Sequence, residues 1–208
     1  MAHIREDVSR ETEIRFSRYL ELLREWQGRM NLVAPSTLDD ARDRHIEDSL
    51  QLVDFLPSDL RVNNWVDFGS GAGFPGLVVA IALDCHVHLI ESRAKKCLFL
   101  QHVADELDLA HRVTVHCERA ESMTAPKADI ISARACAALP KLFDWGMGFA
   151  AQHTCWLLPK GRGVAAEVTA AQADFTFEHE LFVSRTDADA RIVAARRVRR
   201  IEGRETHR

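Results

Sequence analysis

The sequence contains no apolar run of the roughly 20 residues needed to cross a bilayer. Its first residues, MAHIREDVSRETE, lack the apolar core of a signal peptide. No Cys-x-x-Cys pair occurs among the five cysteines, which argues against a disulfide framework and against a zinc site. We therefore expect a cytoplasmic protein without a metal site or a membrane partner, and we expect it to be monomeric.

The composition is that of a globular protein, with an uneven distribution of charge. Of 208 residues, 47% are hydrophobic and 28% are charged, enough for one good core. The net charge is −4, but residues 191–208 carry seven arginines and two glutamates, which leaves −9 for the rest of the chain. Such a basic run is either a solvated surface or a contact for a phosphate backbone. As phosphate contacts the candidates are Arg196, Arg197, Arg199 and Arg200.

Hydrophobic periodicity divides the chain into a helical start and a strand–helix repeat. Apolar residues recur three or four apart over residues 8–30, and a second helical region follows Pro35 and ends at Pro57. From about residue 59, short apolar runs alternate with helical stretches, as in a mostly parallel sheet with helices on both faces. The last two runs, FTFEHELFV and RIVAARRV, are joined too closely for a crossover helix and must pair antiparallel. We expect an N-terminal helical extension, residues 1–58, and one compact α/β unit, residues 59–208.

A glycine-rich turn, GSGAGFPG, follows the first strand of this unit and opens its first helix. The letters GAGFPG fit a dinucleotide fingerprint, whereas DFGSGAG fits the loop of an S-adenosylmethionine (SAM) enzyme. Glycines let the chain turn tightly there and bring its backbone close to a ligand. Glu91, at the end of the next strand, suits the two ribose hydroxyls of an adenosine group and is compatible with either cofactor.

Asp67, two residues before the first glycine, discriminates between the cofactors. A pyrophosphate at a helix N-terminus is favoured by backbone N–H groups and the helix dipole, and a carboxylate beside it would repel it. SAM has no phosphate and carries a sulfonium and an ammonium, which the same carboxylate favours. A SAM methyltransferase is thus the preferred hypothesis. An NAD(P)-dependent oxidoreductase and a catalytically silent SAM-binding or ribosome-binding module are the alternatives.

Six stretches together resemble the RsmG family, also called GidB, of bacterial small-subunit rRNA guanine-N7 methyltransferases. In order they are RHIEDSL (44–50), DFGSGAGFPG (67–76), LIESRAKKCLFL (89–100), RAE (119–121), ISARA (131–135) and PKG (159–161). The resemblance implies a Rossmann-like class I SAM-dependent methyltransferase that methylates N7 of one guanine in the 530 loop of 16S rRNA. Its partner would be 16S rRNA or the small ribosomal subunit.

The resemblance and the local patterns together give a set of expected site residues. The cofactor contacts would be Asp67, Gly69, Gly71, Gly73, Phe74, Glu91, Ala120, Glu121 and Arg134. Arg134 follows an apolar strand at the ligand-binding edge of the sheet, where its guanidinium can reach RNA phosphate or the SAM carboxylate. Lys160 is a second phosphate candidate. His45 and Asp48, at i and i+3 on one helix face, are with Arg134 candidates for substrate positioning.

The sequence also lacks two catalytic devices of other nucleobase methyltransferases. The strand DIIS stands where enzymes that methylate amino groups carry Asp or Asn followed by Pro-Pro and an aromatic residue, and no Pro-Cys pair offers a thiolate nucleophile. Guanine N7 needs neither, because it has an in-plane lone pair and no proton to lose. In-line methyl transfer then depends on proximity and orientation and requires no general base.

Overall fold

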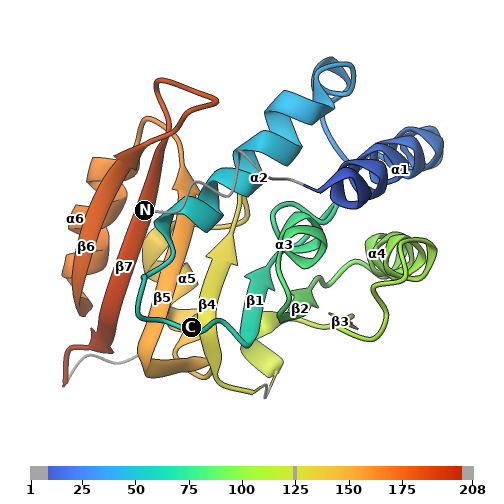
Figure 1. Ribbon diagram of the computed structural model, residues 1–208. Helices are drawn as coiled ribbons and strands as arrows, with labels where there is room; N and C mark the ends of the chain where they lie inside the picture. The colour runs from blue at the N-terminus through green and yellow to red at the C-terminus, as the bar shows by residue number, and fades with distance from the viewer. Residues whose placement is uncertain (1–8, 124–125, 203–208) are drawn as a thin grey trace.

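A seven-stranded mixed sheet runs through the protein in the order β3-β2-β1-β4-β5-β7-β6 (Figure 1). The computed structural model describes residues 9–123 and 126–202, so the first eight residues and the last part of the basic tail lie outside the described residues. The strands are β1 (Asn64–Phe68), β2 (His86–Ile90), β3 (Val113–His116), β4 (Ala128–Ala133), β5 (Ala150–Lys160), β6 (Phe175–Val183) and β7 (Arg191–Arg200).

The strand pairings confirm the expected sheet. β1 pairs in parallel with β2 and β4, β2 with β3, and β4 with β5, whereas β7 is antiparallel to both β5 and β6. The final pair is joined through residues 184–190, and β7 inserts between β5 and β6. In Figure 1 the arrow of β7 therefore points opposite to that of β4.

Helices cover both faces of the sheet, as the strand–helix alternation predicts. α1 (Arg10–Gln27), α3 (Gly76–Ala82) and α4 (Ala94–Glu106) share one hydrophobic cluster, and α5 (Leu139–Gly146) and α6 (Val164–Gln172) share the other (Figure 1). α6 was not predicted, because its alanine-rich sequence gives only a weak apolar period. None of the helices in the described part of the chain is both long and apolar enough to span a membrane.

The second helical region is irregular, in contrast to the single helix expected up to Pro57. It consists of the 3₁₀ turn η2 (Pro35–Thr37), the π-helical segment η3 (Arg42–Glu47), the short helix α2 (Asp48–Leu50) and the 3₁₀ turn η4 (Gln51–Phe55). A wider π turn rotates the following side chains relative to an α-helix, and such turns are frequent at functional sites. The α-helical spacing of His45 and Asp48, i and i+3, therefore does not predict the directions of their side chains.

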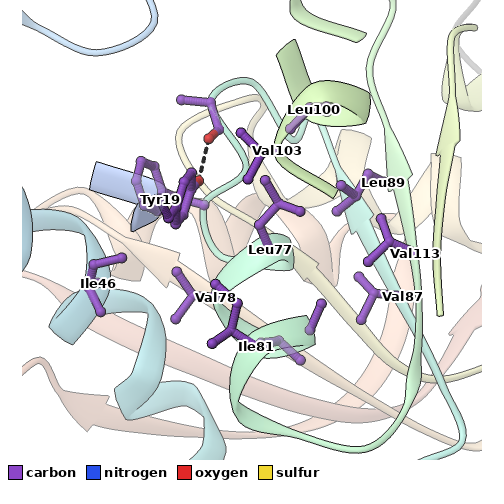
Figure 2. Packing of buried hydrophobic residues seen from close by; sticks show 14 of the residues in the cluster. Tyr19, Ile46, Leu77, Val78, Ile81, Val87, Leu89, Leu100, Val103 and Val113 are labelled. Atoms are coloured by element: carbon purple, nitrogen blue, oxygen red, sulfur yellow. Dashed lines mark hydrogen bonds between the residues drawn. The ribbon is translucent and has the colours of Figure 1, made fainter. Parts of the chain in front are cut away.

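The N-terminal helix α1 packs directly on the glycine turn. Ser9 caps the helix by accepting from Thr12 N, and its buried face includes Tyr19, the only tyrosine of the chain. The Tyr19 hydroxyl donates to the Ala72 carbonyl, the dashed bond in Figure 2, and its ring lies 5.2 Å from that of Phe74. The extension and the α/β unit thus share one core, from which Figure 2 shows Ile46 and Val78 among others.

A buried histidine on β2, His88, makes the fold sensitive to acid. His88 is 7% exposed, its Nδ1 lies 3.1 Å from Nε2 of His116, and its ring is stacked on that of His116 and tilted against that of His86. Burial, and then the neighbouring imidazoles, lower the pKa of His88 from 6.5 to about 4. The unfolded chain therefore takes up this proton at higher pH than the folded one, so stability is lost as pH falls from 6.5 towards 4.

We expect the pKa shift of His88 to cost roughly 2–3 kcal/mol of unfolding free energy between pH 7 and pH 4.5. Urea unfolding of wild type and His88→Val at both pH values measures this contribution, because the valine variant lacks the titrating group. The pH-dependent loss should be smaller in the variant by that amount. Equal losses in the two proteins would show that His88 does not contribute to the acid sensitivity.

Candidate functional site

A cavity of about 640 Å³ opens where the parallel strands β1, β4 and β5 end. Its wall is formed by residues 32–37 and 44–48 of the N-terminal segment, by the loops after these strands, and by the β6–β7 connection. Open α/β sheets bind ligands at this edge. Seven of the predicted site residues line the cavity: His45, Asp48, Gly69, Gly71, Phe74, Arg134 and Lys160.

The glycine turn has the backbone that its sequence predicts. Gly69, Gly71 and Gly73 have φ values of +62°, +60° and +93°, in the left-handed region that side chains rarely adopt. A Cβ on Gly69 would lie 2.6 Å from Cβ of Cys136, and one on Gly73 would lie 2.6 Å from the Tyr19 hydroxyl. A side chain at Gly69 or Gly73 is therefore excluded both by the backbone conformation and by the lack of space. At Gly71 the backbone conformation alone requires glycine.

Glu91 is 7% exposed and lies beside the glycine turn without lining the cavity, so its role as a ribose acceptor stays a prediction. Its Oε2 accepts from Gly71 N at 3.0 Å and its Oε1 accepts from Arg93 N at 2.8 Å, so the carboxylate is fixed beside the glycine turn. Each oxygen keeps a second lone pair, which can accept from a ribose hydroxyl. Ala120 and Glu121 lie in the 3₁₀ turn η5 (Ala120–Ser122) after β3, outside the cavity lining, and their contact with adenine stays a prediction.

We expect Glu91→Ala to weaken SAM binding by roughly 1–3 kcal/mol, because both ribose acceptors are lost and the Gly71 amide loses its partner. Titration calorimetry with SAM measures the effect. Glu91→Gln is the matched control: it keeps the size of the side chain and one acceptor oxygen, and it should lose less affinity. If the alanine variant binds SAM as tightly as wild type, Glu91 is not part of the site.

Asp67 lies beneath the glycine turn and does not line the cavity. It has no exposed surface, and its Oδ1 accepts from Oγ of Ser132 at 2.7 Å, which in turn accepts from the Trp65 indole. Oδ2 is buried and has no hydrogen-bond partner among the described residues. Burial raises the pKa of Asp67 to about 6, against the opposing effect of its hydrogen bonds. Asp67 therefore does not reach the cavity surface, and a direct contact with SAM stays a prediction.

The three positioning candidates come together around Phe74. Arg134 Nη1 donates to Asp48 Oδ2 at 3.2 Å and to the Arg44 carbonyl at 3.3 Å, and the guanidinium carbon lies 5.1 Å from the centre of the Phe74 ring. The His45 ring is stacked on the same phenylalanine, with 4.9 Å between centroids. Burial, and then the charge of Arg134, lower the pKa of His45 to about 4, so the imidazole is neutral near pH 7.

The N-terminal segment also holds the β6–β7 connection, which the sequence did not indicate. Asp48 Oδ1 accepts from Thr186 Oγ1 at 2.7 Å and from Gln51 Nε2 at 2.8 Å. Gln51 additionally donates to Ser184 and accepts from Arg185 N. These hydrogen bonds join segments more than 130 residues apart into one wall of the cavity, a long-range relation that no local motif signals.

The basic residues predicted to contact RNA phosphate, Lys160 and the arginines of β7, do not lie together at the ligand-binding edge of the sheet. Lys160 is 9% exposed, and its ammonium contacts Glu167 at 2.8 Å and the Ala137 carbonyl, so its charge is neutralised. In the register of β5 and β7, Arg191 lies opposite Lys160 at the ligand-binding edge of the sheet. Arg196 lies opposite Cys155, farther along the antiparallel strand. At about 3.3 Å per residue, residues 196–200 lie roughly 17–30 Å from Arg191, towards the opposite edge of the sheet.

Two of the four β7 candidates are also paired with carboxylates, Arg197 with Glu178 and Arg200 with Asp144. Their contact with RNA stays a prediction. The cations that line the cavity besides Arg134 and Lys160 are Arg44, Lys96 and Arg191. Within the described ranges, no three His, Cys, Asp or Glu side chains form a group suited to a metal ion.

Comparison with known proteins places these features in one family. The family model described as rRNA small subunit methyltransferase G matches residues 12–193. A protein named ribosomal RNA small subunit methyltransferase G from Rhodospirillum centenum is 49% identical over 180 residues, which cover 86% of this chain and 82% of that protein. Proteins of the same name from Methylorubrum populi and Gluconobacter oxydans are 42% and 40% identical, covering 94% and 93% of this chain and 93% and 98% of their own length.

Solved structures agree on the fold. The ribosomal protein L11 methylase of Lactobacillus delbrueckii superposes with a TM-score of 0.60 at 12% identity, over 74% of this chain and 78% of that chain. A variant of MtNAS in complex with S-adenosylmethionine gives the same TM-score at 14% identity, over 89% and 72%. The Rossmann-like class I methyltransferase fold is thereby confirmed.

Proposed function

Because this chain belongs to the small-subunit ribosomal RNA methyltransferase G family of SAM-dependent enzymes, we propose that it methylates N7 of a guanine in the 530 loop of 16S rRNA. The proposal rests on one observation, that the glycine turn is part of both the predicted cofactor site and the wall of the cavity. The left-handed glycine turn and Glu91 fit an adenosine cofactor, and the turn forms one wall of a cavity that also contains Arg134 and His45.

The chain's own residues bind and orient, and SAM when bound supplies the electrophilic methyl group. The backbone of Gly69 and Gly71 allows close approach of the cofactor, and Glu91 accepts from its ribose. Arg134, held by Asp48, presents a fixed cation at the cavity wall. Since guanine N7 carries a free lone pair, no residue has to remove a proton, and the rate depends on alignment of the nucleophile with the methyl group.

Mass-spectrometric mapping of methylated nucleotides in rRNA tests the proposal, with RNA from cells that contain or lack this protein. We expect one 7-methylguanosine in the 530 loop to depend on the protein, and the purified enzyme with SAM to restore it in small subunits or in 16S rRNA from the deficient cells. Absence of any methyl transfer would favour the silent binding module. A methyl group on another atom or in another loop would contradict the assignment.

Salt dependence distinguishes the cavity rim from the far edge of β7 as an RNA contact. We expect Arg44→Gln to weaken RNA binding and to reduce the slope of log affinity against log salt by roughly 0.7–0.9 for one lost phosphate contact. Arg199→Gln removes the same charge at the opposite edge and should leave both values unchanged. Filter-binding or fluorescence titrations at several salt concentrations give the slopes. The reverse result would restore the β7 arginines as the main phosphate contacts.

A further inference from the structure

The His45 imidazole carries a buried nitrogen, Nδ1, with no hydrogen-bond partner in the part of the chain that the structure describes. The residue is 8% exposed and lines the cavity, and its Nδ1 makes no hydrogen bond with any described residue. An unpaired polar atom in a buried position costs free energy that a hydrogen bond from a ligand would recover. The observation therefore points to a ligand group that donates at this place.

The neighbouring threonine fixes which nitrogen is the acceptor. Thr37 Oγ1 donates its single hydrogen to the Ala34 carbonyl at 2.8 Å, so it can only accept from His45 Nε2, which lies 3.0 Å away. A neutral imidazole with its proton on Nε2 has a lone pair on Nδ1. Burial and the adjacent Arg134 charge favour the neutral ring. In this tautomer His45 Nδ1 is an acceptor.

A donor lies beside this acceptor. Arg134 uses Nη1 for Asp48 and for the Arg44 carbonyl, and its other guanidinium nitrogens donate to no group among the described residues. Arg134 and His45 contact the same Phe74 ring, at 5.1 and 4.9 Å from its centre. The cavity wall thus presents a donor next to an acceptor, held in place by one aromatic side chain.

On these contacts, and resting on the proposed function, we propose that His45 is a specificity-determining residue that reads the target base: Nδ1 accepts from guanine N1–H while Arg134 donates to O6. On adenine the order is reversed, with an amino donor at position 6 and a lone pair on N1, so both contacts would fail. Enzymes that act on an extruded base commonly recognise its Watson–Crick edge. This arrangement leaves N7, beyond O6, free to face the methyl group.

Two substitutions separate the acceptor from its support. In His45→Gln the terminal amide replaces Nε2 and keeps the donor to Thr37, but the acceptor at Nδ1 is lost. In His45→Asn, Oδ1 takes the place of Nδ1 and the bond to Thr37 is lost. We expect kcat/KM on guanine RNA to fall roughly 10- to 100-fold for the glutamine variant and only a few-fold for the asparagine variant, with SAM affinity unchanged in both.

The base itself gives a test that needs no variant. With inosine at the target, O6 and N1–H are retained and the wild-type enzyme should methylate the RNA. With 2-aminopurine, N7 is retained but O6 and N1–H are absent, and methylation should be largely lost. Discrimination between these two bases should shrink in His45→Gln by the factor that the variant loses on guanine, as expected for two groups that interact directly.

Three results would overturn the inference. The glutamine variant could keep wild-type kcat/KM and base discrimination, or both variants could be impaired equally with discrimination intact, as for a structural residue. The glutamine variant could also lose SAM affinity by the same factor, which would assign Nδ1 to the SAM ammonium. If the wild-type enzyme methylates no guanine of small-subunit rRNA, the proposed function fails, and that result is distinct from these three.

Discussion

RNA with 7-deazaguanine at the target position is expected to receive no methyl group from this enzyme. The analogue keeps O6, N1–H and the amino group, so recognition of the base is preserved, but a carbon replaces the nucleophilic nitrogen. Without an in-plane lone pair, in-line displacement at the methyl group cannot occur. Radiolabelled methyl transfer to synthetic RNA measures this, with guanine RNA of the same sequence as the control. The 7-deazaguanine RNA should bind as tightly as the unmodified RNA in a competition assay. Persistent methylation would show that another atom is the acceptor.

The same reaction should be nearly independent of pH. N7 is unprotonated near neutrality, and the buried imidazole of the cavity, His45, has its pKa lowered to about 4. We expect single-turnover rates at saturating SAM and RNA to be flat from roughly pH 6 to 9. A titrating limb near pH 7 would instead indicate a general base.

Gly73→Ala is expected to abolish SAM binding and to destabilise the fold by about 3–5 kcal/mol. Gly73 has a φ of +93°, and an added Cβ would lie 2.4 Å from Cδ1 of Leu77 and 2.6 Å from the Tyr19 hydroxyl. Both neighbours are fully buried, so neither can move without disturbing the shared core. The strain and the clash act on the turn that we propose holds the cofactor.

Gly163→Ala is the matched control for this substitution. Gly163 has a φ of −78°, and no atom lies within 4 Å of a Cβ placed there, so the variant should be within about 0.5 kcal/mol of wild type and bind SAM normally. Urea unfolding and SAM calorimetry on both variants give the comparison. Normal SAM affinity and stability in Gly73→Ala would mean that the turn tolerates a side chain.

The glycine turn and the position of Glu91, which we propose hold the cofactor, could be predicted from the sequence because the signals are local. The glycine turn and Glu91 follow two consecutive strands, and parallel strands end at the same edge, so spacing alone brings them together. Arg134 could be placed at the cavity in the same way, since it follows β4, and its contact with SAM or RNA stays a prediction. The short connection between the last two apolar runs likewise predicted the antiparallel end of the sheet.

The rest of the cavity wall, which we propose faces RNA, could not be predicted, because it depends on contacts between segments that are distant in the sequence. A run of arginines looks like one basic patch until the direction of β7 is known, and its antiparallel course carries the run away from the cavity. The sequence does not indicate that Lys160 has an ion-pair partner. Its partner Glu167 lies on α6, a helix whose apolar periodicity is weak. The π turn of η3 similarly changes the side-chain directions that an α-helical period assigns to His45 and Asp48.

The hydrogen bond between Asp48 and Thr186 has a consequence for the order in which the enzyme is made. The two residues are separated by 138 positions, so the cavity wall that they form cannot close until nearly the whole chain has been synthesised. Contacts of such separation are slow to form, because a long loop must be closed before they contribute. During synthesis the cavity wall can therefore be completed only after the β6–β7 connection has been made.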